Sequence, residues 1–331
     1  MRLLILRCGD VLPEVSGDLR DRVPESARVE LHQLSEVPAR RELRFLDEAA
    51  KEILPTDPTP SLDEISAQPD VDHLTTPGPA PQLPHLKERL RVVVLGTDAA
   101  LSAVLTRMMR ADYLWAEVAF IPVGGTTAGR NWGLPDAVPE ALELALRGEV
   151  RPVPLIRNDA GLAVAGSATI SQWEGEEITG EIIVDDHVLL RHLGGEGTRF
   201  DGIFGARIVP MTDAPGIAAV RAVSPVAAEA GGEAEEAGRT PGLRRRLGTW
   251  LADSVSPRTA QNLSEMSGVG WLLRGVSAPA GRLDPESLAT GRAVQAGGPS
   301  LAGVVDGVAG RRAVERTTFY RHLRDLQIVR P

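Results

Sequence analysis

Eight residues in three short segments carry groups that could do chemistry. Each segment follows an apolar run. Glycine and threonine at the end of a buried strand present backbone amides and hydroxyls, which bind phosphate, and aspartate oxygens bind divalent cations. The candidates are Gly96, Thr97 and Asp98; Gly124, Gly125, Thr126 and Thr127; and Asp306.

The elements around the first segment predict a strand, a tight turn and a helix. Residues 92–95 are an apolar run, and apolar residues recur at helical spacing from Leu101 to Met109. In open α/β sheets, ligands bind where strand ends meet helix starts. An ordinary strand–helix turn inside a core is the alternative. Asp98 would then cap the helix, and Asp306 would belong to a hairpin turn.

The order and spacing of these segments resemble those of the diacylglycerol kinase and sphingosine kinase superfamily. There a strand ends in Gly-Gly-Asp-Gly-Thr, a second strand precedes Pro-x-Gly-Thr, and Asp-Gly-Glu lies near the end. The resemblance implies ATP-dependent phosphorylation of a lipid hydroxyl, with Asp98 and Asp306 as catalytic residues. It also implies Mg²⁺ at Asp98 and ATP phosphates at the glycine–threonine turns.

The departures from this pattern support two other hypotheses. Thr97, Ala99 and Ala100 replace two glycines and a threonine, and Val308 replaces the glutamate that acts as general base. Pro154 stands where the second domain usually opens with an aspartate. A degenerate, non-catalytic relative that binds nucleotide or lipid and serves as a regulator or scaffold is one alternative. A soluble enzyme similar to NAD kinases is the other.

The chain is long enough for two domains. Strand–helix alternation predicts an α/β domain with a mostly parallel sheet at 1–150, interrupted by a proline-rich segment without regular structure at 54–86. Closely spaced strands predict a β-rich region at 151–331, including a hairpin around Asn158, and the family resemblance implies that this region is a β-sandwich of lipid-binding type. Within it, 227–240 reads as a flexible linker, and the last strand, 326–329, is a candidate to return to the first domain.

Composition limits the class of protein. The chain has 331 residues, 43% of them hydrophobic, and a net charge of −9, which argues against nucleic acid as a partner. The single cysteine, Cys8, and the lack of a membrane-length apolar run favour a cytoplasmic protein. A basic amphipathic segment at 241–255 is a candidate contact with the inner membrane face, and an ordinary helix docked on the sandwich is the alternative. The expected partner is a lipid or small-molecule acceptor, and a homodimer is a candidate assembly.

Overall fold

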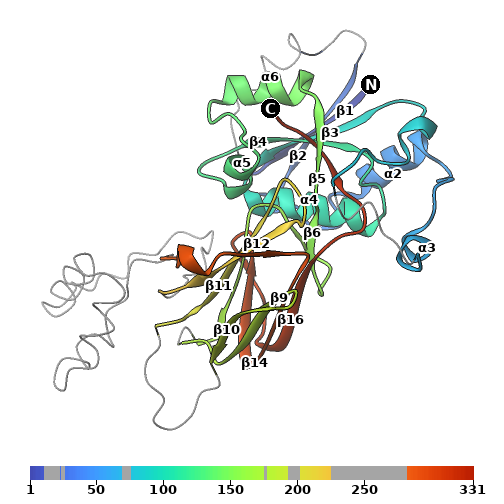
Figure 1. The fold of residues 1–331 in the computed structure, drawn as a ribbon. Coiled ribbons are helices and arrows are strands. Elements are labelled where there is room, and N and C mark those ends of the chain that lie inside the picture. Colours follow the sequence, from blue (N-terminus) through green and yellow to red (C-terminus); the bar gives the residue numbers. More distant parts are fainter. Residues whose placement is uncertain (11–22, 24–26, 69–75, 175–176, 193–201, 225–281) are drawn as a thin grey trace, which may run out of the picture.

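A six-stranded, mostly parallel sheet forms the first domain of the computed structural model, which describes residues 1–10, 23, 27–68, 76–174, 177–192, 202–224 and 282–331 (Figure 1). The strand order is β2-β1-β3-β4-β17-β5, and only β5 runs antiparallel to its neighbour. The strands are β1 (Arg2–Cys8), β2 (Arg28–Leu34), β3 (Leu90–Gly96), β4 (Glu117–Pro122), β5 (Val150–Val153) and β17 (Leu326–Val329).

Both faces of this sheet are buried, which explains the unbroken apolar runs of β1 and β3. Alternate side chains point to opposite faces: Leu3 and Ile5 pack with α6, whereas Leu4 and Leu6 pack with α2 and α4. The helices are α2 (Arg44–Ile53), α3 (Leu62–Ser66), α4 (Asp98–Arg110), α5 (Thr127–Asn131) and α6 (Val138–Arg147), with short 3₁₀ turns at Leu83–His85 and Pro285–Ser287.

A buried arginine fixes α6 against the sheet. Arg91, only 2% exposed, donates to Ala145 O at 2.9 Å, Leu146 O at 3.0 Å and Gly148 O at 2.9 Å. Its Nε donates to the Glu117 carboxylate at 2.7 Å. The last carbonyls of a helix have no hydrogen-bond partner within the helix, and Arg91 supplies donors to those of α6. The positive charge of Arg91 is balanced by the Glu117 carboxylate.

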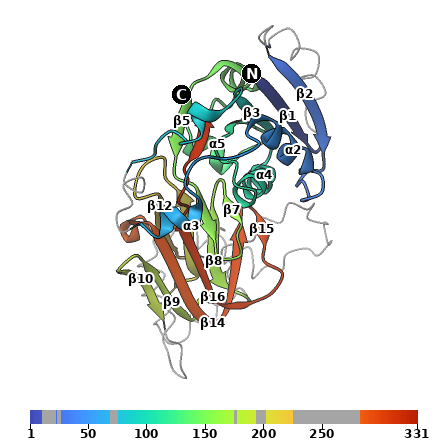
Figure 2. The same ribbon diagram turned by 90° about the vertical axis from the view of Figure 1, so that its right-hand side faces the viewer.

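The second domain is an antiparallel β-sandwich around its own apolar core (Figures 1 and 2). The long strand β14 joins its layers: residues 293–297 pair with β9 and β16, and 301–305 pair with β8. The strands are β6 (Ile156–Asn158), β7 (Ala163–Val164), β8 (Ala168–Gln172), β9 (Gly180–Val184), β10 (His187–His192), β11 (Gly205–Pro210), β12 (Ile217–Ala222), β13 (Ala289–Gly291), β14 (Ala293–Val305), β15 (Val308–Ala309) and β16 (Val314–Arg321).

This architecture confirms the predicted fold class, an α/β domain followed by a β-sandwich. The chain enters the sandwich after β5 and returns from it to place β17 between β4 and β5. The predicted boundary at residue 150 therefore falls at the first residue of β5, which belongs to the first sheet. The hairpin around Asn158 forms between β6 and β7, with shorter strands than the sequence predicts.

The expectation that 54–86 lacks regular structure is wrong in two parts, α3 and the 3₁₀ turn at Leu83–His85. Ser61 and Glu64 form a capping box that starts α3, because each side chain bonds the backbone amide of the other residue. Elsewhere the described part of this segment lies against the approach to β17: Gly78 N donates to Asp325 at 3.0 Å, and Gln327 donates to Gly78 O at 3.1 Å. The proline-rich segment therefore helps to attach the returning chain.

Two sequence-based expectations concern other residues. The linker at 227–240 and the amphipathic segment at 241–255 lie outside the described residues. Across the residues that are described, no helix combines the length and apolar character that crossing a membrane requires.

Candidate functional site

The two glycine–threonine turns lie side by side, as the sequence predicts, because β3 and β4 are neighbouring parallel strands with Gly96 paired to Pro122. Gly96 is closely packed: a Cβ there would lie 3.0 Å from Ala100 Cβ and 3.1 Å from Cys8 Cβ. Thr97 caps α4, since its hydroxyl accepts the Ala100 amide at 3.3 Å. This hydroxyl is therefore used within the turn.

The second turn combines an open and a closed part. Gly124 and Gly125 are exposed, and no atom lies within 4 Å of a Cβ built at either position. Gly124 has a φ of +76°, a conformation that favours glycine. Thr126 is buried and caps α5 by accepting the Gly129 amide at 3.3 Å. Only the two glycines thus present open backbone at this turn.

Asp98 joins the two turns. It is the first residue of α4, and its carboxylate reaches across to the start of α5, where Oδ2 accepts the Thr127 amide at 2.6 Å and Oδ1 accepts the Ala128 amide at 3.1 Å. These amides belong to the turn that the sequence assigns to phosphate. A protein carboxylate therefore bonds the amides that a bound anion would otherwise use.

Asp306 lies in the turn between β14 and β15, with a positive φ of 50°. Its carboxylate is buried and accepts three backbone amides, from Ala165 at 2.7 Å, Gly166 at 2.7 Å and Ser167 at 2.9 Å. Burial raises the pKa of Asp306 to about 7; the three amides oppose this rise, and the charge of Asp98 adds to it. Asp306 thus holds the segment that begins β8.

Gly166 brings the two carboxylates together. A Cβ on Gly166 would lie 2.5 Å from Asp98 Oδ2 and 2.9 Å from the Ala128 amide nitrogen. The Gly166 amide bonds Asp306, while its carbonyl accepts the Asn131 side chain at 3.0 Å. Carboxylates from two domains, 208 residues apart in sequence (306 minus 98), therefore meet around one glycine.

Sequence analysis missed three residues of this site, Arg207, Gly166 and Asn131, because none of them belongs to a recognisable motif. Arg207, on β11, donates to Thr127 Oγ1 at 3.4 Å and to Ser167 Oγ at 3.2 Å. Gly166 and Asn131 complete the contacts described above. A cation within the apolar strand Gly205–Pro210 is the one local signal that could have drawn attention to Arg207.

Val308 and Asp306 do not share a face, contrary to the expectation for an extended strand. Asp306 and Gly307 both have positive φ, 50° and 80°, and reverse the chain between β14 and β15. As a result, Asp306 is buried, whereas Val308 is 49% exposed. Asp306 is therefore not positioned to take the role of the glutamate that Val308 replaces.

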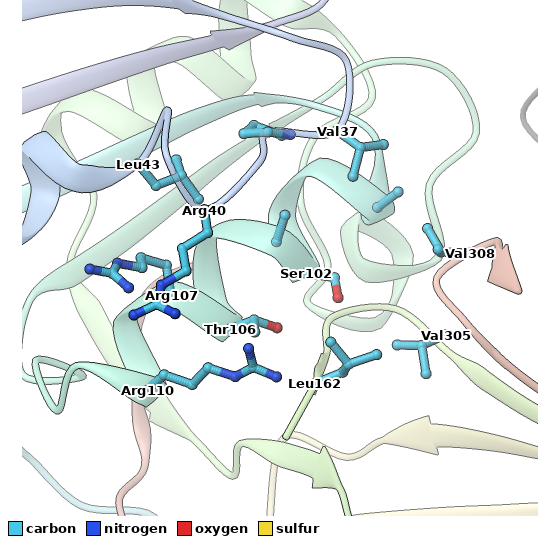
Figure 3. A pocket seen from close by; sticks show the side chains of 13 residues that line it. Val37, Arg40, Leu43, Ser102, Thr106, Arg107, Arg110, Leu162, Val305 and Val308 are labelled. Atoms are coloured by element: carbon cyan, nitrogen blue, oxygen red, sulfur yellow. The ribbon is translucent and has the colours of Figure 1, made fainter. Parts of the chain in front are cut away.

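A pocket of about 230 Å³ lies on the other side of α4, between the two domains (Figure 3). The loop at 37–43 and α4 supply most of its wall, and Leu162, Val305 and Val308 of the sandwich close it. Figure 3 shows the Arg40 and Arg107 side chains at one end, Val305 and Val308 at the other, and the Arg110 guanidinium beside Leu162 between them. The pocket thus has a basic end and an apolar end.

The two carboxylates that would serve a magnesium–ATP complex are both engaged by the protein itself. Asp98 and Asp306 both have each carboxylate oxygen engaged by a backbone amide. Within the described ranges there is also no group of three or more His, Cys, Asp or Glu side chains placed to hold a metal ion. Magnesium is commonly held by one or two carboxylates together with substrate phosphates and water, so at this site it would compete with the backbone amides for the carboxylate oxygens.

Comparison with known proteins identifies the fold. No family model and no curated protein matched the chain. Among solved structures, two of a putative diacylglycerol kinase from Bacillus anthracis str. Sterne align over all of this chain and 97% of theirs, at 8% identity and TM-scores of 0.54 and 0.51. An NAD kinase from Archaeoglobus fulgidus aligns at 12% identity with a TM-score of 0.38, too low to support an argument. The resemblance to the diacylglycerol kinase-like superfamily is thereby confirmed at the level of the fold.

Proposed function

We propose that this chain is a non-catalytic relative of the diacylglycerol kinase-like proteins, which binds a lipid-type ligand between its domains and acts as a regulator or scaffold. The observation that carries the proposal is the position of Asp98. Its carboxylate is held by the Thr127 and Ala128 amides, so it serves as an anchor between α4 and α5.

The loss of a general base supports the same proposal. A general base contributes about 10²–10⁴-fold to the rate of a reaction that must remove a proton. Val308 has no group that accepts a proton, and Asp306 is buried under three amide donors. An acceptor hydroxyl in this cleft would therefore have no carboxylate positioned to deprotonate it.

A lipid kinase is the second candidate, and one observation favours it. Asp98 and Asp306 come from different domains and converge on Gly166, which is where the family resemblance would place catalytic carboxylates. Arg207 lies beside them and carries a charge suited to phosphate. This candidate requires Asp98 to leave the α5 amides when nucleotide binds.

Phosphoryl transfer distinguishes the two candidates. Wild type, Asp98→Asn and Val308→Glu would be incubated with radiolabelled ATP, Mg²⁺ and a mixture of diacylglycerol and sphingoid lipids. Asp136→Asn is the matched control, because Asp136 is exposed. We expect no labelled lipid with any variant. Labelled lipid from wild type and Asp136→Asn, but not from Asp98→Asn, would establish the kinase and reject the proposal.

A further inference from the structure

The pocket beside α4 has an unusual charge for this protein. The whole chain carries a net charge of −9, yet none of the pocket's lining residues is acidic and three are arginines. The Arg107 guanidinium forms an ion pair with Asp47, which neutralises it. Arg110 donates to the carbonyls of Gly161 and Ala160, at 3.0 and 2.9 Å. No carboxylate of the described residues forms an ion pair with it, so within that part of the chain its positive charge is not balanced.

Arg40 provides a second uncompensated charge. It is exposed at the edge of the pocket and has no hydrogen-bond or ion-pair partner among the described residues. Arginine prefers carboxylate and phosphate oxygens, which it can bind with two parallel hydrogen bonds. The basic end of the pocket is thus suited to an anionic group.

Apart from Ser102 and Thr106, the rest of the wall is formed by apolar side chains. They come from the 37–43 loop, from α4 and from the sandwich: Val37, Pro38, Leu43, Ala99, Ala103, Leu162, Val305 and Val308. Val308 is 49% exposed and Val37 44% exposed, so a ligand that covered them would remove apolar surface from water. A volume of about 230 Å³ exceeds the ~150 Å³ of an engineered apolar cavity that holds benzene, so an alkyl chain fits in the pocket.

The walls are fixed by hydrogen bonds before any ligand binds. The Glu42 carboxylate accepts the Ser35 amide at 2.9 Å and the Ala39 amide at 2.8 Å, which holds the loop that carries Arg40. On the opposite side, Ser102 Oγ donates to Ala163 O at 2.7 Å, and the Ala163 amide donates to Thr106 at 2.9 Å. A preformed pocket binds without the cost of ordering its walls.

We infer that this pocket binds a single-chain amphipathic anion, an alkyl phosphate or alkyl carboxylate, with its head group at Arg40 and Arg110 and its chain against Leu162, Val305 and Val308. The inference names the ligand class of the binding role proposed above and rests on it. Because the pocket lies between the domains, an occupied pocket would connect α4 to the β14–β15 turn.

Calorimetric titration without ATP tests the inference. The probes are octyl phosphate, octanoate, octanol and inorganic phosphate, each below its aggregation concentration. We expect one-to-one saturation with octyl phosphate or octanoate, and none with inorganic phosphate. Arg40→Glu should weaken binding by about tenfold or more, because it places a negative charge beside the head group. Ala103→Phe, which fills the pocket, should also weaken it.

The matched control is Arg41→Glu, which makes the same charge change at the next residue, an exposed one that does not line the pocket. Its affinity should equal that of wild type. Absence of saturation, equal affinity for octanol, or equal weakening by Arg41→Glu would overturn the assignment. Each of these results leaves the phosphotransfer assay unaffected, so the two proposals fail separately.

Discussion

Replacing Asp98 with alanine tests whether this residue is an anchor. The substitution leaves the Thr127 and Ala128 amides without their acceptor, where the wild type bonds them at 2.6 and 3.1 Å. A hydrogen bond to a charged group contributes about 1.5–3 kcal/mol to stability. Asp98 is half-buried, and its removal also relieves repulsion with Asp306. We therefore expect the free energy of unfolding to fall by about 2 kcal/mol, below the sum of two such bonds.

If Asp98 is retained for catalysis, Asp98→Ala is expected to leave the free energy of unfolding unchanged or to raise it. Groups kept for function beside a like charge are commonly destabilising, so their removal leaves stability unchanged or raises it. Urea unfolding followed by tryptophan fluorescence measures the difference, with Asp136→Ala as an exposed control expected to lie within about 0.5 kcal/mol of wild type. Unchanged or increased stability in Asp98→Ala would refute the anchor role.

Three further substitutions probe the packing around the site. Gly166→Ala places a methyl group 2.5 Å from Asp98 Oδ2, so amide exchange at Thr127 should accelerate, as mass spectrometry would detect; unchanged exchange would contradict the packing. Because burial raises the pKa of Asp306 from 3.8 to about 7, the folded chain keeps a proton that the unfolded chain releases, so wild-type stability should fall as pH rises between these values. Asp306→Asn should remove that fall in pH-dependent urea unfolding, and an identical pH profile would contradict it. Arg91→Met should lower the free energy of unfolding by about 3 kcal/mol, because it leaves the carbonyls at the end of α6 without a hydrogen-bond donor. A loss under about 1 kcal/mol in the same assay would argue against the role of Arg91 at the end of this helix.

The positions of the two turns could be predicted from the sequence because the signals are local. An apolar run followed by glycine and threonine defines a buried strand and the start of a helix, and parallel neighbours bring such turns to one edge. This reasoning placed Gly96 and Gly124 correctly. The same local pattern did not reveal β2, whose Val29 and Leu31 are exposed at the edge of the sheet.

The chemistry of the site could not be predicted in the same way, because its contacts are distant in sequence. Asp98 bonds amides 29 and 30 residues away, and Asp306 bonds amides about 140 residues away. The partners of each carboxylate depend on the register of the two sheets. They also depend on Gly166, whose missing side chain lets the Asp98 carboxylate come close to its backbone. Arg207 reaches the site only through the sandwich, so no spacing rule finds it.

The geometry also separates neighbours that the sequence groups together. Asp306 and Val308 are two residues apart, but the turn between them buries one and exposes the other in the pocket. A strand periodicity assumes extended backbone, and positive φ at Asp306 and Gly307 violates that assumption. The exposed valine then becomes informative, since it marks the apolar end of the pocket.

Calorimetric titration of the wild-type chain with MgATP tests the central claim most directly. If the Asp98 carboxylate retains the Thr127 and Ala128 amides, a phosphate finds only the Gly124 and Gly125 backbone open at this turn, and Mg²⁺ has to compete with the two amides for Asp98. We therefore expect no saturable heat of binding for wild type or for Val308→Glu. Saturable, one-to-one binding of MgATP that is lost in Asp98→Asn but kept in Asp136→Asn would contradict the account.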